Sequence, residues 1–140
     1  MADAVNYPDF PETPIYFKDV DKVNKGRYAT LELNINTDGN IRGHFTVENM
    51  QALVGCHISG HYDLFDNMGN LIARVKMPNL GLQPAWISIA SVRHHDFEGK
   101  IKSEELGRVR RIDFTGYEEP TFDQLEEIMK VIKEDLNIFE

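Results

Sequence analysis

The fold is decided by residues 27–47, which read RYATLELNINTDGNIRGHFTV. Apolar and polar residues alternate over residues 27–36, and the alternation resumes over residues 41–47, after Asp38 and Gly39. A period of two is typical of a strand with one buried face. Asp-Gly between two such runs is a strong hairpin signal, because glycine accepts a positive φ angle. The stretch therefore predicts an antiparallel β-hairpin.

Similar runs continue through most of the chain. We expect further strands at residues 15–18, 54–65, 71–77, 85–93, 97–102 and 109–117, with residues 78–84 and 94–96 as loops. The run at 85–93 is apolar on both faces, which suits a strand covered on one side by the interior and on the other by a helix or a second subunit. The sequence predicts an all-β fold, an antiparallel up-and-down barrel of about seven or eight strands.

The two ends of the chain differ from this central part. Residues 1–14 contain three prolines, which predict an extended arm without ladder pairing. Residues 119–140 predict a C-terminal amphipathic α-helix, with Thr121 as its N-cap and Gln124 three residues later. Its apolar stripe consists of Phe122, Leu125, Ile128, Met129, Ile132, Leu136 and Phe139. We expect a single domain, with the barrel at residues 15–118.

Charge and composition limit the function classes. The chain has 140 residues, a net charge of −8 and one cysteine, Cys56, so it cannot form an internal disulfide. Residues 118–140 hold eight acidic residues and two lysines, a net charge of −6, which disfavours binding to nucleic acid. We find no signal-peptide pattern and no apolar run of about 18 residues. We therefore expect a cytoplasmic protein that has no membrane segment.

Two stretches resemble the avidin-type barrels: TDGNIRGHFTVEN at residues 37–49 and LVGCHISGHYD at residues 53–63. Each contains a Gly-x-aromatic step like those of that family, and Gly26-Arg27-Tyr28 is similar to its first such step. The resemblance implies a calycin-type barrel in which Tyr28 and Phe45 face a ligand. A helix after the barrel is similar to that of the lipocalins. Biotin-binding barrels present several tryptophans and this chain has only Trp86, so we take from the resemblance the architecture and not the ligand.

Five residues are candidates for ligand binding: Tyr28, Phe45, Tyr62, Trp86 and Arg110. If the alternation of the last strand holds, Arg110 shares a side with the core residues that follow it. Its guanidinium would then lie in the barrel or at its mouth. There it would bind a carboxylate or phosphate of a ligand, or an internal glutamate.

Histidines form a second candidate site. If residues 41–47 pair with residues 54–65, His44 lies opposite His57, and His61 and Asp63 continue the same face. Three imidazoles and a carboxylate suit zinc, nickel or copper. The alternatives are a solvated polar face and a histidine base. Cys56 lies on the apolar face of its strand, so we expect it in the core.

Three function classes remain open. The first is a non-catalytic barrel that holds a small-molecule ligand in or at its mouth. The second is an acidic protein-binding module, of an inhibitor or immunity type. The third is a small barrel enzyme, such as a lyase or isomerase, that uses barrel histidines. Because we recognise no catalytic motif, we favour binding, assign no catalytic residue and no cofactor, and leave a homo-oligomer open.

Overall fold

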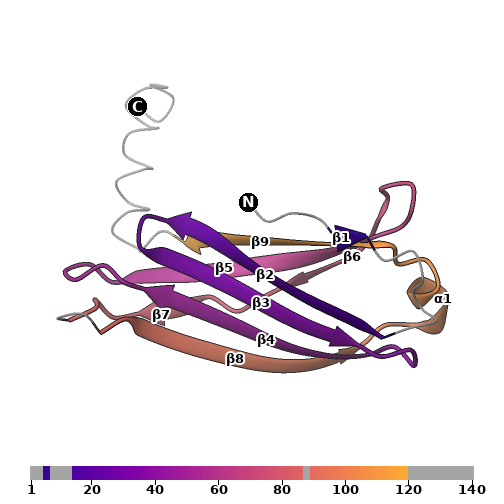
Figure 1. The fold of residues 1–140 in the computed structure, drawn as a ribbon, viewed down its shortest axis with the longest axis horizontal. Helices are drawn as coiled ribbons and strands as arrows, with labels where there is room; N and C mark the ends of the chain where they lie inside the picture. Colours follow the sequence, from indigo (N-terminus) through magenta and orange to yellow (C-terminus); the bar gives the residue numbers. More distant parts are fainter. Residues whose placement is uncertain (1–4, 7–13, 87–88, 120–140) are drawn as a thin grey trace, which may run out of the picture.

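The computed structural model describes residues 5–6, 14–86 and 89–119 of the chain. These residues form strands and one short helix (Figure 1). In chain order the elements are β1 (Val5–Asn6), β2 (Ile15–Asn24), β3 (Arg27–Ile35), β4 (Asn40–Asn49), β5 (Cys56–Phe65), β6 (Leu71–Lys76), β7 (Leu80–Leu82), β8 (Ser91–Lys100), α1 (Ser103–Leu106) and β9 (Arg111–Glu119).

Hydrogen bonds join the strands into two antiparallel sheets that face one another (Figure 1). The four-stranded sheet has the order β2-β3-β4-β8. The five-stranded sheet has the order β1-β9-β5-β6, and β7 pairs with the first part of β5. The predicted antiparallel all-β fold is confirmed. The predicted closed barrel is not found in the described residues, where the strands form a two-layer sandwich instead.

The two sheets come closest to joining where β2 approaches β9. The Asp21 carboxylate on β2 accepts a hydrogen bond from the backbone N–H of Gly116 on β9, at 2.9 Å. A Cβ atom at position 116 would lie 2.7 Å from the Cβ of Ala29, so only glycine allows this approach. Pairing of β2 with β3 also shifts in register between Lys22 and Asn24. A side-chain bridge therefore takes the place of the ladder that would close a barrel.

The core lies between the sheets and follows the predicted alternation. In β3 and β4 every second residue is buried, from Ala29 to Ile35 and from Ile41 to Asn49. Phe45 of one sheet meets Phe114 of the other edge to face, with ring centroids 6.2 Å apart. Burying such rings removes a large apolar area from water, which is the main force that holds the two sheets together.

The predicted hairpin at residues 27–47 is confirmed. β3 and β4 pair in register from Arg27 opposite Asn49 to Ile35 opposite Ile41. Gly39 has a φ angle of 92° in the turn, and its N–H donates to the carbonyl of Asn36 at 3.0 Å. Local sequence signals were sufficient here because both strands and the turn are adjacent in the chain.

The next connection differs from the prediction. The expected pairing of residues 41–47 with residues 54–65 does not occur, because the chain crosses to the other sheet after β4. β4 pairs instead with β8, from Asn40 opposite Lys100 to Asn49 opposite Ser91. The strand expected at 85–93 is also displaced. β8 begins at Ser91 and contains His94, His95 and Asp96, which were expected in a loop.

Several smaller expectations change at the ends and connections. The predicted arm contributes β1, whose Val5 and Asn6 pair with Ile112 and Arg111 of β9. The predicted loop at 78–84 contains β7. The predicted C-terminal helix, at residues 119–140, lies outside the described residues except for Glu119, which ends β9. In the part of the chain that the structure describes, no helix has the length and apolar character needed to cross a membrane.

Candidate functional site

The five predicted ligand-binding residues do not converge. Phe45 and Tyr62 are buried between the sheets, where burial raises the pKa of the Tyr62 hydroxyl to about 12. Tyr28 lies on the outer face of β3, between the inward-facing positions of that strand. Trp86 is 62% exposed in the connection between β7 and β8. Arg110 precedes β9, beside α1 at the other end of the sandwich (Figure 1).

Arg110 contacts main-chain carbonyl oxygens, whereas the sequence predicts a carboxylate or phosphate partner. Its Nη1 donates to the carbonyl of Gly107 at 3.0 Å and to that of Val109 at 2.7 Å. Its backbone N–H donates to the carbonyl of Phe65. Arg110 does not share a side with the core residues of β9 as predicted, because it lies in the turn after α1 and precedes that strand. The guanidinium therefore stabilises that turn.

The four predicted metal ligands lie in two different sheets. His44, on β4, is opposite Glu32 and Asp96, whereas His57, on β5, is opposite Gly81 and Glu119. The assumed register that brought His44 to His57 is therefore wrong, because β4 and β5 are not paired. Among the described residues, no group of three or more histidine, cysteine or acidic side chains is arranged to hold a metal ion.

His61 and Asp63 do lie together on the outer face of β5. The His61 Nδ1 is 3.4 Å from an Asp63 carboxylate oxygen. The same carboxylate accepts two hydrogen bonds from Arg74, at 2.8 and 2.9 Å, a bidentate pair that fixes its orientation. Asp63 thereby ties β6 to β5. This arrangement is that of a structural ion pair with a neighbouring imidazole.

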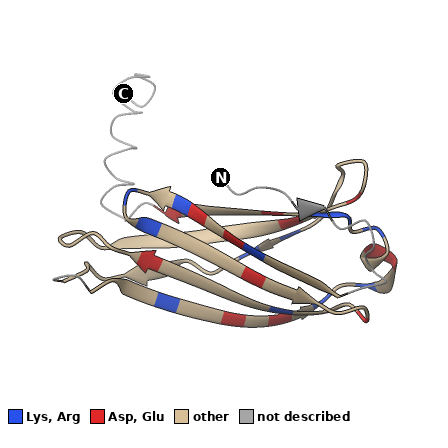
Figure 2. Cartoon of the chain, viewed as in Figure 1, with Lys and Arg blue, Asp and Glu red and all other residues tan. Residues whose placement is uncertain are grey.

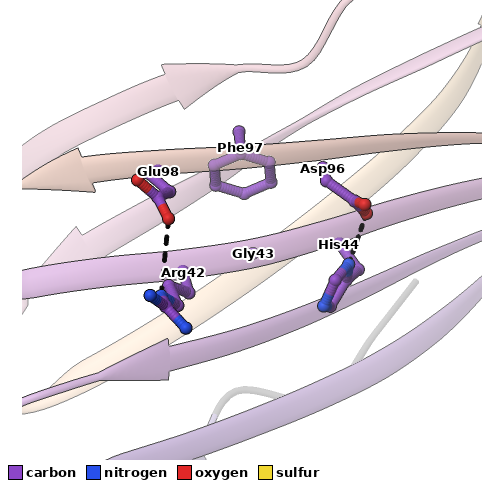
Figure 3. Close-up of a pocket in the computed structure, with 6 residues that line it drawn as sticks. All are labelled: Arg42, Gly43, His44, Asp96, Phe97 and Glu98. Atoms are coloured by element: carbon purple, nitrogen blue, oxygen red, sulfur yellow. Dashed lines mark hydrogen bonds and ion pairs between the residues drawn. The ribbon is translucent and has the colours of Figure 1, made fainter.

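A shallow groove of about 630 Å³ runs over the outer face of β4 and β8 (Figure 3). Two cross-strand pairs flank it, Arg42 with Glu98 at 3.4 Å and His44 with Asp96. The hydrogen bond and charge of Asp96 raise the pKa of the His44 imidazole. These side chains are mostly exposed, and exposed pairs contribute little stability. In charge and exposure the groove matches an ordinary solvated sheet face.

The glycine beneath this groove has a packing role. A Cβ atom at Gly43 would lie 2.1 Å from the ring of Phe97 on β8. The Phe97 ring also stacks on Tyr62 of the opposite sheet, with centroids 6.1 Å apart. The Gly-x-aromatic step of the sequence thus makes room for an aromatic ring from the neighbouring strand, and this ring helps to fill the interior.

A stronger candidate is a cluster of exposed apolar side chains at one end of the sandwich, which we call the apolar end. It is formed by the β4–β5 connection, the β7–β8 connection and the start of β8. Its large apolar residues are between 44% and 82% exposed: Met50, Leu53, Val54, Trp86, Ile89 and Val92. Single exposed apolar residues are ordinary, whereas six on adjacent segments make this end a candidate interaction surface.

A buried polar network holds the first of these connections in place. Arg27, only 5% exposed, forms an ion pair with Glu118 of β9. Its Nη2 donates to the side chain of Gln51 at 3.3 Å and to the carbonyl of Gly55 at 3.4 Å, and its Nε donates to Asn49 at 3.4 Å. A buried charge is costly unless it is paired, and here every arm of the guanidinium has a partner.

The same network joins the two connections to each other. The buried Asn49 amide donates to the carbonyl of Val54 at 2.8 Å and to that of Gln83 at 3.1 Å. The backbone N–H of Ala85 donates to the carbonyl of Gln51 at 2.8 Å. Hydrogen bonds from beneath therefore hold the two loops that carry the exposed apolar residues.

Sequence reasoning found only part of this surface. The apolar run at residues 85–93 predicts a strand covered on both sides, but in the structure Trp86 and Ile89 form an isolated bridge, and both side chains are exposed. Met50 and Leu53 lie between two predicted strands, where the alternation pattern gives no sign of their exposure. Cys56, as predicted, is in the core, and burial raises the pKa of its thiol, which opposes a role as nucleophile.

Comparisons with known proteins give no further guidance. No protein-family model matches the chain, and a search of curated proteins finds no match.

Proposed function

We propose that this chain is a protein-binding β-sandwich module that contacts its partner through the apolar end. The observation that carries the proposal is the concentration of exposed large apolar side chains on two hydrogen-bonded loops. This is the protein-binding alternative of the sequence analysis, with an apolar contact surface in place of an acidic one.

Rigid loops favour this function. Binding costs less free energy when the contact surface is already ordered, and Arg27 and Asn49 supply that order. Trp86 is the side chain best suited to be the central anchor, because tryptophan is enriched among the residues that dominate binding energy. Leu53, the most exposed of the six, offers a second anchor.

A protein partner is favoured over a membrane surface by charge. The chain has a net charge of −8, and the cytoplasmic leaflet of membranes is itself negative. Apolar loops that enter such a leaflet are usually supported by basic residues, which this composition does not favour. An apolar cleft on another protein meets no such repulsion.

A ligand inside the fold has less support. The rings of Phe45, Phe97, Tyr62 and Phe114 occupy the space between the sheets and pack against one another. A small-molecule site would then have to use an open surface such as the β4–β8 groove. Catalysis by histidine is likewise less supported, because His44 and His61 lie on the outer faces of different sheets.

The test uses two residues of equal exposure at opposite ends. Leu53 in the apolar end is 82% exposed, and Met68 in the β5–β6 turn is 81% exposed. A photo-crosslinking amino acid placed at Leu53 or at Met68 in the full chain, in its native extract, identifies the protein captured at each position. Affinity of the captured protein is then measured by biolayer interferometry against the unmodified chain and the variants Leu53→Asp, Trp86→Asp and Met68→Asp.

We expect capture at position 53 and not at position 68. Leu53→Asp and Trp86→Asp should each weaken binding about tenfold or more, and Met68→Asp should weaken it less than about twofold. Equal losses in all three variants, or none in the first two, would refute the assignment. Trp86-dependent binding to vesicles of zwitterionic or anionic lipid, without protein capture, would favour a membrane partner instead.

A further inference from the structure

The four-stranded sheet ends in β8, which has ten residues and no strand paired to its outer edge among the described residues. Its register with β4 is continuous from Ser91 to Lys100, with no bulge and no proline. Figure 1 shows β8 along the border of its sheet. A long, regular edge of this kind is a template for another strand.

The other edges of the sandwich are less suited to pairing. β2 has a register shift near its end, and it carries Lys18 and Lys22 on its outer face. β6 has only six residues, has a register shift against β5, and is followed closely by Pro78. Short length, bulges, lysines, proline and inward-facing charges are the devices by which edge strands avoid pairing. β8 is long and has neither bulge nor proline, and its devices are Lys100 at its last position and Arg93, which donates to the carbonyl of Gly81 on β7.

We propose that a second copy of this chain pairs antiparallel with β8, with His95 of each copy on the two-fold axis, so that two four-stranded sheets become one continuous sheet. Two-fold symmetry makes such an interface self-complementary, so residue i opposite residue j implies j opposite i. The polar residues of β8 favour this register. Every second residue faces outward, and the outward positions after Val92 hold His94, Asp96, Glu98 and Lys100.

With residue 95 on the axis, His94 of each copy lies directly opposite Asp96 of the other. An imidazole N–H can donate a hydrogen bond to a carboxylate directly opposite it, and such polar pairs favour strand pairing. Asp96 already contacts His44 of its own chain (Figure 3), so it would lie between two imidazoles.

The two registers shifted toward the C-terminal end of β8 place acidic residues together. An axis at residue 96 puts the Asp96 residues of the two copies opposite one another. An axis at residue 97 puts Asp96 opposite Glu98. Like charges directly opposite one another disfavour pairing. An axis at residue 94 avoids this repulsion but puts Asp96 opposite Val92, so the pair between His94 and Asp96 is lost. Figure 2 shows both acidic and basic residues along β8.

The proposal is independent of the apolar end, and its test measures self-association of the purified chain alone. Light scattering after size exclusion, over a dilution series, should show a dimer that dissociates at low concentration. The variant His95→Cys, treated with the thiol oxidant diamide, should give a disulfide-linked dimer, because directly opposite Cβ atoms are about 5 Å apart. In Glu98→Cys the two sulfurs would be about 20 Å apart across the same register, and no crosslink should form.

Charge reversal at positions 94 and 96 supplies a second measurement. Loss of folding cannot explain its expected result, because an unfolded chain would not regain association in the double variant. Asp96→Lys should weaken the dimer about tenfold, because each of the two His94 side chains loses its carboxylate partner. The double variant His94→Asp with Asp96→Lys reverses both partners and should restore association. A chain that is monomeric at all concentrations, or that crosslinks equally through positions 95 and 98, would overturn the proposal. Failure of the double variant to recover association would overturn the register.

Discussion

The two ends of the sandwich close their connections in different ways. At the end that holds α1, the turns at residues 36–40 and 66–70 are short, mostly polar and bonded within themselves. Asp66 accepts hydrogen bonds from the backbone N–H groups of Met68 and Asn70. At the apolar end the β4–β5 and β7–β8 connections are longer than these two turns, and Arg27 and Asn49 hold them from the neighbouring strands.

In our proposal, this difference decides which end binds a partner. A turn that uses its own aspartate for hydrogen bonds has little freedom in its composition, and its polar side chain is already engaged. A loop fixed from beneath by a distant arginine can vary its outward residues without loss of structure. The apolar residues Leu53 and Trp86 are exposed on loops of this second kind.

The largest effect is expected from removing the support of the apolar end. Arg27→Met should lower the free energy of unfolding by about 4 kcal/mol, because it leaves Glu118 without its buried partner. Hydrogen exchange should rise in residues 49–55 and not in residues 66–70. The matched control is Arg42→Leu, whose guanidinium is paired with Glu98 but 78% exposed, and urea melts should place it within about 0.5 kcal/mol of the unmodified protein. Equal costs at Arg27 and Arg42 would contradict the network as a support.

A smaller effect is expected at the opposite end, where two turn glycines differ only in their surroundings. Gly39 and Gly69 both have positive φ angles, 92° and 82°. A Cβ at Gly39 would lie 2.5 Å from the carbonyl oxygen of Ile101, whereas nothing lies within 4 Å of one at Gly69. Gly39→Ala should therefore cost about 3 kcal/mol and Gly69→Ala about 1 kcal/mol in urea melts. Equal losses of unfolding free energy in the two variants would mean that the positive φ angle alone sets the loss, and that the contact with Ile101 relaxes.

The smallest effect is expected at Asp66, and it depends on pH. Hydrogen bonds from Asn70, Met68 and Arg108 lower the pKa of the Asp66 carboxyl below its usual value of 3.8. A carboxyl with a lowered pKa stabilises the fold above its unfolded pKa, and that stability is lost as the pH falls through its folded pKa. Asp66→Ala should destabilise the protein near neutral pH, by less than Gly39→Ala. The gap in unfolding free energy between the unmodified protein and Asp66→Ala should be smaller at about pH 3 than near neutral pH, as measured by urea melts of both proteins. A gap that stays constant between the two pH values would show that the charge of the turn is not what stabilises it.

The sequence by itself determined the hairpin at residues 27–47, the strands predicted at 54–65 and 71–77, and the buried sides of β3 and β4. Each of these rests on neighbours in the chain: alternation sets the buried face, and Asp38-Gly39 sets the turn. Cys56 could be assigned to the core for the same local reason.

Only the tertiary structure decided which strands meet across long connections. Nothing in residues 48–55 shows that the chain crosses to the other sheet. The sequence therefore predicts His57 opposite His44, whereas in the structure the residues opposite His44 are Glu32 and Asp96. Arg110 was assigned to a strand that begins one residue later. The apolar run after Pro84 predicts a covered strand, because apolar residues are usually buried. Whether they are buried depends on the whole fold, and here Trp86 and Ile89 are exposed. Pairing and exposure arise from contacts between residues distant in the chain, and local alternation carries no information about them.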